Sequence, residues 1–233
     1  MKRLPHTPSW LPMSLHIAHG LVAGGVGYML GFAAVIYMHA EPGSIRSTIA
    51  VVAAFALTVF ELAFFIYLIL RRKRMRRLWA EASVMIKAEE WEAAKITLKE
   101  LLKYPEYRLA PAPVLFALGS CAEGNGDQRE AMVLYRRCGD LPAALRAIGI
   151  LQLQRGLNDS AAEALRKLVA RRPDDTFSVV LLAVALFRGG NQGAARKVLE
   201  RALGRRPRSE MLRVNLARVE KGDEPVFELG PAE

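Results

Sequence analysis

The second half of the chain resembles itself when the sequence is shifted by 34 residues. Gly156 falls on Gly190, and Arg171-Arg172-Pro173 falls on Arg205-Arg206-Pro207. Further matches pair Ala161 with Ala195 and Leu165 with Leu199. Self-similarity at a period of about 20–50 residues is typical of solenoids, in which each unit buries its apolar face only against its neighbours. The period therefore predicts a stack of small repeated units.

Two looser copies precede these. The nearer copy keeps the same relative spacing in Leu115, Leu118, Gly119, Ala122, Gly126, Ala131, Tyr135 and Cys138, and the earlier one in Leu78, Ala82, Met85, Ala94, Leu98, Leu101 and Pro105. Within a unit, apolar residues recur at spacings of three and four, a glycine interrupts them and a proline ends them. This pattern predicts a pair of helices per unit. Asp127 with Glu130, and Ser160 with Glu163, are predicted to form capping boxes that open the second helix of their units.

These spacings resemble the tetratricopeptide repeat family over about residues 75–207. The resemblance implies an all-α fold, an α-solenoid of about three to four helix pairs in a domain spanning residues 78–221. Residues 209–221 are expected to form its solvent-facing capping helix, and residues 222–233 an acidic flexible tail. The earliest copy is the weakest, since it lacks the turn glycine.

In that family, exposed positions on the first helix of each pair line an inner groove. By resemblance, the groove residues here are Phe116, Ser120, Glu123, Arg146, Ile150, Gln154, Phe177, Val180, Val184, Phe187 and Arg188. The run Val179–Phe187 is apolar around the whole helix, so it needs a cover. A partner segment, a second copy of the chain, or the Pro225-Val226-Phe227 tail would each supply one. Such a groove suits an apolar or amphipathic peptide. If a second copy supplies the cover, the protein forms a homo-oligomer.

Two long apolar runs occupy residues 17–38 and 49–70. Each is long enough to cross about 30 Å of hydrocarbon as a helix. A buried core helix is the less favoured interpretation, because the runs are long, end in aromatic residues and stop at a basic cluster. A cleavable signal peptide is also disfavoured, since Met38 stands where cleavage requires a small residue. The runs predict a transmembrane hairpin over residues 17–70, preceded by a cytoplasmic segment, residues 1–16.

A basic juxtamembrane segment, residues 71–77, follows the second run. Its six cationic residues are Arg71, Arg72, Lys73, Arg74, Arg76 and Arg77. By the positive-inside rule, both ends of the chain are cytoplasmic and the connector faces outward, as in a multi-pass protein of a bacterial-type inner membrane. The cluster is expected to contact anionic lipids. Residues 78–233 carry 24 basic and 21 acidic groups, so the positive balance is local and predicts no nucleic-acid partner. Cys121 and Cys138 are expected to be free thiols in this reducing compartment.

The two apolar runs also contain small residues and one acidic residue whose role is either structural or functional. Gly20, Gly24, Gly27 and Gly31 share one face of the first run. That face suits close helix packing, either within the hairpin or against a partner's helix. Glu61 lies near the middle of the second run, where an ionised carboxylate is costly. It is either a protonated group hydrogen-bonded inside the hairpin, or a partner contact or proton-linked site.

The sequence contains few candidates for catalytic chemistry. All four histidines precede residue 41, so the repeat region has no histidine base or ligand. His16 and His19 share a helical face, but an interfacial polar pair is favoured over ligation of a metal or haem. The glycine-rich stretch 189–193 coincides with the turn between two helices and is no phosphate loop. We therefore expect no enzyme, no catalytic residue, no metal and no cofactor.

The sequence favours a non-enzymatic, membrane-anchored scaffold or adaptor with protein partners, acting in assembly of an envelope complex. The alternative is a regulatory or accessory subunit of a membrane enzyme, protease or transport complex that acts through the transmembrane helices. Two membrane helices, a basic segment and repeat helices also resemble the layout of HemY-type inner-membrane proteins. That resemblance implies location and no activity.

Overall fold

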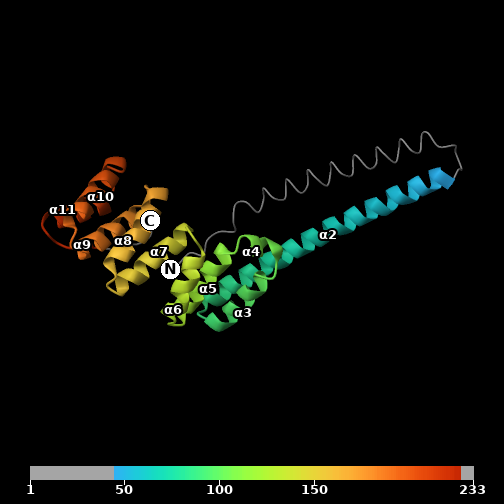
Figure 1. Ribbon diagram of the computed structural model, residues 1–233, viewed down its shortest axis with the longest axis horizontal. Coiled ribbons are helices and arrows are strands. Elements are labelled where there is room, and N and C mark those ends of the chain that lie inside the picture. Colours follow the sequence, from blue (N-terminus) through green and yellow to red (C-terminus); the bar gives the residue numbers. More distant parts are fainter. Residues whose placement is uncertain (1–44, 227–233) are drawn as a thin grey trace. The chain divides into compact units, whose positions relative to one another are not determined.

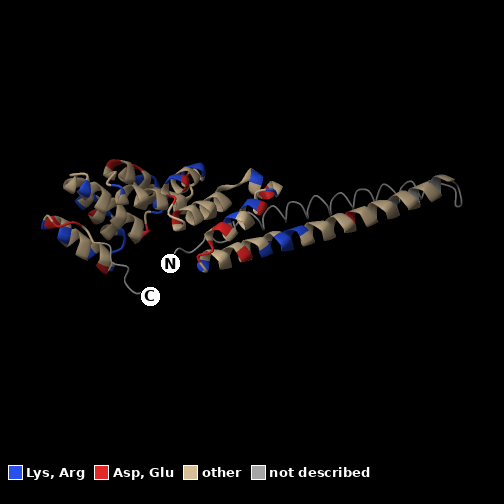
Figure 2. Cartoon of the chain, turned by 90° about the horizontal axis from the view of Figure 1, so that it is seen from below, with Lys and Arg blue, Asp and Glu red and all other residues tan. Residues whose placement is uncertain are grey.

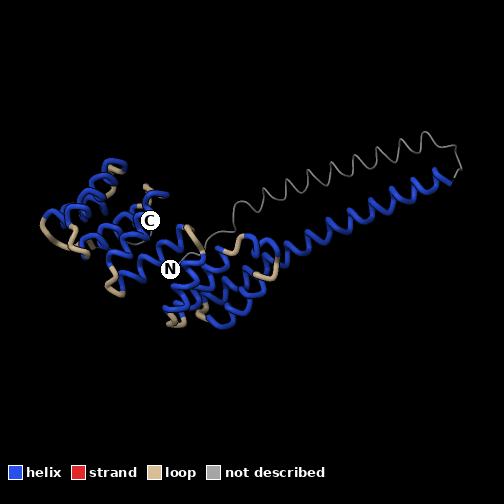
Figure 3. The backbone as a smooth tube through the Cα atoms, in the orientation of Figure 1, coloured by secondary structure: helices blue, strands red, loops and turns tan. Residues whose placement is uncertain are grey.

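The computed structural model describes residues 45–226, apart from the side chains at 46, 47, 50 and 54. All regular secondary structure in this range is helical (Figure 3). By its internal contacts the chain divides into two compact units, residues 1–83 and 84–233. The first predicted membrane span, residues 17–38, lies outside the described range. Its glycine face, Gly20 to Gly31, and the pair His16 and His19 lie outside it too.

Helix α2, Ile45–Lys87, is one uninterrupted helix of 43 residues (Figure 1). It contains the second predicted span, the basic segment and the beginning of the earliest repeat copy. No Pro or Gly occurs in it, and the Arg, Lys, Leu and Met residues after position 68 are strong helix formers. Within the described residues, one helix is long and apolar enough to cross a membrane, and the other half of the expected hairpin lies outside them.

The two parts of α2 expose different side chains (Figure 2). Apolar residues such as Phe55, Phe60 and Leu70 are exposed along its first half. Past residue 70, Lys73, Arg74, Arg76 and Arg77 are exposed, whereas Arg71 and Arg72 are half-buried. Met75 and Ala82 are buried on the opposite side of the helix from Lys73 and Arg77.

The second unit is a succession of helices. Their bounds are α3 Trp91–Leu101, α4 Pro105–Leu109, α5 Ala112–Gly124, α6 Gln128–Arg137, α7 Pro142–Gln154, α8 Asn158–Arg171, α9 Thr176–Arg188, α10 Gln192–Arg205 and α11 Glu210–Glu220. Helices α5 and α6, α7 and α8, and α9 and α10 pack as pairs, and each pair contacts the next (Figure 1). Helix α11 packs on α10 and α9 as the expected capping helix. The short helix α4, which begins at Pro105, was not anticipated.

Glycines in the left-handed region make the turns within the pairs. Gly126, Gly156 and Gly190 have φ of 84°, 72° and 77°. A residue with a Cβ is strained there, so the repeated turn glycine is explained by backbone geometry. In the earliest copy the equivalent residue is Glu89, which adopts φ 61°. The weak sequence match of that copy thus corresponds to a less favourable turn.

Small residues let the helices of a pair approach closely. A Cβ added to Gly119 would lie 2.6 Å from Cε1 of Tyr135, and one added to Gly149 would lie 2.7 Å from Cγ of Leu165. Both distances are too short for a side chain to be added without a shift of the neighbour. The glycines therefore set the separation between α5 and α6 and between α7 and α8.

The N-caps confirm part of one predicted capping box, the Asp127 cap, and correct the other at Ser160. Asp127 caps α6 by accepting from the backbone N–H groups of Arg129 and Glu130, at 3.1 and 2.8 Å. Ser160 is not a cap, because α8 already begins at Asn158 and its N-cap is Leu157. The turn glycine sets where the helix starts. Leu157 follows Gly156 as Asp127 follows Gly126, so the cap falls three residues before Ser160.

Candidate peptide-binding groove

The structure divides the eleven predicted groove residues into two groups. Arg146, Ile150, Phe177, Phe187 and Glu123 are half-buried, and Gln154 and Arg188 are exposed. Phe116, Ser120, Val180 and Val184 are buried, which corrects their assignment to an exposed surface.

Helix α9 explains the correction. Its residues 178–186 are all buried, and 179–186 belong to one apolar cluster with residues of α7, α8, α10 and α11. The cover that this apolar helix needs is supplied by its own neighbouring helices. Val180 and Val184, at 0% and 6% exposure, belong to that core.

A buried tyrosine holds one carboxylate at the inner face of α5. The Tyr135 hydroxyl donates to Oε2 of Glu123 at 2.7 Å and lies 3.3 Å from Oγ of Ser120. Its ring packs against Phe116, with 5.4 Å between ring centroids. Burial raises the pKa of Tyr135 well above its usual range, so the phenol stays protonated and acts as a donor. Glu123 is therefore held in place as an oriented acceptor.

Arg146 links α7 to α9. Its guanidinium pairs with the Asp175 carboxylate, and its Nε donates to Oγ of Ser178 at 3.3 Å. The same guanidinium lies over the Phe177 ring, 5.2 Å from the centroid. The aromatic face and the carboxylate both attract the cation. The result is a half-buried surface in which a guanidinium, paired with a carboxylate, lies over an aromatic ring.

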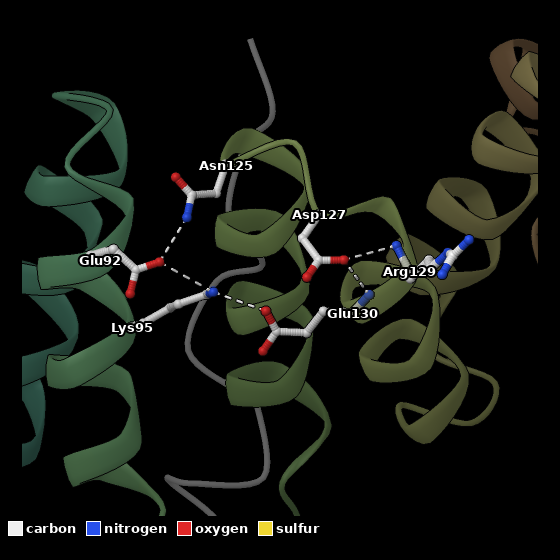
Figure 4. A network of polar contacts seen from close by, with 6 residues as sticks. All are labelled: Glu92, Lys95, Asn125, Asp127, Arg129 and Glu130. Carbon is white, nitrogen blue, oxygen red and sulfur yellow. Dashed lines mark hydrogen bonds and ion pairs between the residues drawn. The ribbon is translucent and has the colours of Figure 1, made fainter.

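A second polar network joins the earliest repeat copy to the next (Figure 4). Lys95 on α3 contacts Oε1 of Glu92 at 3.3 Å and Oε2 of Glu130 on α6 at 2.9 Å. Nδ2 of Asn125 donates to Glu92 at 2.7 Å. The hydrogen bond with Glu130 is the main cause of the raised pKa of Lys95. Sequence reasoning missed this network, because Glu130 was expected to complete the capping box with Asp127.

The described residues offer little for catalysis. In residues 45–226 there is no group of three or more His, Cys, Asp or Glu that could hold a metal ion. Cys121 and Cys138 are free and buried, as expected for unpaired thiols. Burial raises the pKa of Cys121 to about 11 and that of Cys138 to about 12, which disfavours the nucleophilic thiolate.

Comparison with known proteins agrees with the helix-pair architecture. The sequence profile of the tetratricopeptide repeat matches residues 146–210. A tetratricopeptide repeat protein from Parabacteroides merdae ATCC 43184 is 16% identical, with a TM-score of 0.57, over 64% of this chain and 60% of that one. The structure titled MamA RS-1 ArsTM double mutant is 16% identical, with a TM-score of 0.53, over 63% and 83%. At these identities the likeness concerns the fold. No curated protein matches the chain.

Proposed function

We propose that this chain, which contains tetratricopeptide repeats, is a non-enzymatic scaffold, anchored in a bacterial-type inner membrane, that binds a peptide segment of a protein partner. The fold itself suggests a protein-interaction scaffold. The membrane anchor, the peptide class and a role in assembly of an envelope complex are the further steps of the proposal.

The half-buried residues of the inner face support the peptide class. Ile150, Phe177 and Phe187 offer apolar surface, while Gln154 and Arg188 are exposed and polar. Apolar contacts with polar groups beside them suit an amphipathic segment. The observation that carries this proposal is the Arg146–Phe177 arrangement, because a cation stacked on a ring presents both chemistries in one place.

Helix α2 supports the membrane anchor. Its first half exposes a continuous apolar surface, which in water would be unfavourable and in hydrocarbon is not. The basic segment follows at once, where a cytoplasmic membrane surface would lie. The exposed Lys73, Arg74, Arg76 and Arg77 suit contact with anionic lipid headgroups.

Cysteine accessibility tests the anchor and its orientation. The two native thiols are replaced by Ala, and single Cys residues are introduced at Ser44 and at Ser209. A membrane-impermeant maleimide applied to intact cells should label the first variant and not the second. Both should react after lysis. Labelling at Ser209 in intact cells would contradict a cytoplasmic repeat domain.

Site-specific crosslinking tests the groove. A photo-crosslinking amino acid at Gln154 should capture a partner in the otherwise unchanged chain. The additional substitution Ile150→Glu should abolish that crosslink. The matched control is Val133→Glu, which places the same charge at an exposed residue of α6, 57% accessible. Helical circular dichroism should remain unchanged in both variants. If the control loses the crosslink equally, or if Gln154 captures nothing above a probe placed at Val133, the groove does not bind the partner.

A second candidate function rests on Glu61. It is the only charged residue in the apolar stretch 49–70 and is half-buried in the structure. A regulatory subunit of a membrane complex would use such a group to contact a partner's helix. Glu61→Gln should then release the partner while Ile150→Glu does not. The scaffold proposal expects the reverse.

A further inference from the structure

Residues 222–226, which follow α11, are held against the repeat domain, although the stretch 222–233 was expected to be a flexible tail. Gly222, with φ 83°, turns the chain back after the helix. The next four residues, Asp223–Val226, form what we call the strap. The N–H of Asp223 donates to the carbonyl of Arg218 at 2.9 Å, and Pro225 is buried.

Three side chains hold the strap, and they come from two helices. Nε of Arg188, at the end of α9, donates to Oε1 of Glu224 at 2.7 Å. Nε of Arg218 on α11 donates to the backbone carbonyl of Glu224 at 2.9 Å. Oδ1 of Asn215 accepts the backbone N–H of Val226 at 2.7 Å. The strap is therefore recognised through one side-chain carboxylate and two backbone groups.

Asn215 shows that this surface is built to hold a peptide backbone. The residue is 2% exposed, and its Nδ2 is already used by the carbonyl of Met211 at 2.8 Å. Asparagine is unfavourable inside a helix, and a buried amide oxygen needs a donor. The donor is the N–H of Val226, so the presence of Asn215 on a capping helix is explained by the strap.

We propose that the end of α9 and the face of α11 form a binding site for an extended Glu-Pro-X peptide, filled in this chain by its own strap. Arg188 binds the acidic side chain, Pro225 is buried, and Asn215 accepts the next backbone N–H. A peptide without the carboxylate, or without the donor after proline, loses one of the three contacts.

The strap is suited to displacement. The Arg188–Glu224 pair is solvent-exposed, with side chains 44% and 42% accessible, and such pairs are weak. A tethered segment nevertheless stays bound, because a short connection gives it an effective concentration in the millimolar range. Arg188 is also a predicted groove residue. If the groove binds a partner peptide, as proposed above, the strap occupies its C-terminal end until that partner replaces it. Only this step rests on the proposed function.

A peptide supplied in trans tests the site without any knowledge of the partner. The probe is a fluorescein-labelled peptide with the sequence of residues 222–233, and the receptor is the full-length chain in detergent. The strap is released by the double substitution Glu224→Ala and Pro225→Gly. Fluorescence anisotropy should show that the released variant binds the peptide at least about tenfold more tightly than wild type, whose site is filled in cis.

Charge reversal establishes where the peptide binds. Arg188→Glu in the released variant should abolish binding, and a peptide with Lys in place of Glu224 should restore it. The matched control is Arg213→Glu on the exposed face of α11, which should change nothing. Hydrogen exchange gives an independent measurement on the unmodified chain, since the Val226 amide should be protected in wild type and unprotected in Asn215→Ala.

Three results would overturn the proposal. One is equal peptide binding to wild type and the released variant, and another is no binding to the released variant at about millimolar peptide. The third is a wild-type dimer that the released variant does not form, which would assign the site to the strap of a second copy. None of these depends on the groove, so the scaffold proposal can survive them.

Discussion

Arg146 on α7 pairs with Asp175, the residue that caps α9, so one carboxylate stabilises a helix start and joins two repeats. Asp175 accepts from the backbone N–H of Ser178 at 3.3 Å and from its hydroxyl at 2.7 Å. The contact between repeats therefore depends on a group that the local helix needs in any case.

Substitution of Asp175 should separate these two roles. Asp175→Ala removes the cap and the ion pair and should lower the free energy of unfolding by about 1–3 kcal/mol. Asp175→Asn keeps a capping oxygen and loses the charge, so a smaller loss of about 1 kcal/mol is expected. Urea unfolding of the repeat domain, followed by far-ultraviolet circular dichroism, measures both. Equal losses would mean that the ion pair alone matters.

Two glycine substitutions should change the free energy of unfolding in opposite directions. Gly119→Ala places a methyl group against the ring of Tyr135, which is buried and hydrogen-bonded and has little room to move. A loss of about 1–3 kcal/mol is expected from overpacking. Gly204→Ala, in the last turn of α10, meets nothing within 4 Å and should stabilise by up to about 1 kcal/mol. Thermal unfolding of both variants decides. If Gly119→Ala leaves the stability unchanged, helices α5 and α6 can move apart to make room for the methyl group.

The uncapped start of α8 predicts a stabilising substitution. Leu157 is 52% exposed at the N-cap, with no side-chain hydrogen bond to the helix. Asp127 and Asn191 cap α6 and α10 from the equivalent places. Leu157→Asp should therefore raise the free energy of unfolding by about 0.5–2 kcal/mol. Leu157→Ala is the control, because it removes the apolar side chain without a cap. If both variants change stability alike, capping is not the cause.

The buried thiols should be unreactive in the folded protein. Cys121 and Cys138 are 0% and 6% exposed, and each has a raised pKa. At about pH 8, close to the ordinary thiol pKa, a disulfide reagent should label the unfolded chain rapidly and the native chain only through opening. The rate of labelling with and without urea measures this. Fast labelling of the native chain would contradict the packing of α5 and α6.

The same shifts predict a loss of stability at alkaline pH. The pKa of Cys121 rises from 9.0 to about 11 on folding, because burial disfavours the thiolate. Above pH 9.0 the unfolded chain therefore releases a proton that the folded chain keeps, and stability falls as pH rises toward about 11. Tyr135 and Cys138 shift in the same direction. In Cys121→Ala the decline should be shallower, and an unchanged slope would contradict this contribution.

The helix-pair architecture could be predicted from the sequence because the same pattern of residues occurs in several repeats. The turn glycines Gly126, Gly156 and Gly190 and the small residues at Gly119 and Gly149 each have one physical reason, and the structure shows that reason. The helix pairs and the capping helix α11 were predicted on the same grounds. The continuity of α2 was missed, because a change from apolar to basic residues is a change of environment and not of backbone conformation.

The groove was harder to predict than the fold. Val180 and Val184 occupy the same places in their repeat as Arg146 and Ile150, yet they are buried. Burial depends on which helices cover an element, and repeat spacing does not carry that information. The strap was missed for the opposite reason. Its contacts to Arg188 and Asn215 occur once in the chain, so no periodic pattern marks them.

Helix α2 also fixes a rotational phase. Each residue turns an α-helix by about 100°, so Glu61 and Met75 lie within about 40° of each other around its axis. Two residues inserted among Arg71–Arg74 would place these two side chains about 160° apart, on nearly opposite sides of the helix. An insertion of about four residues would nearly restore their alignment. The length of the basic segment therefore matters as well as its charge, because only insertions of whole helical turns preserve the relative orientation of the two ends of α2.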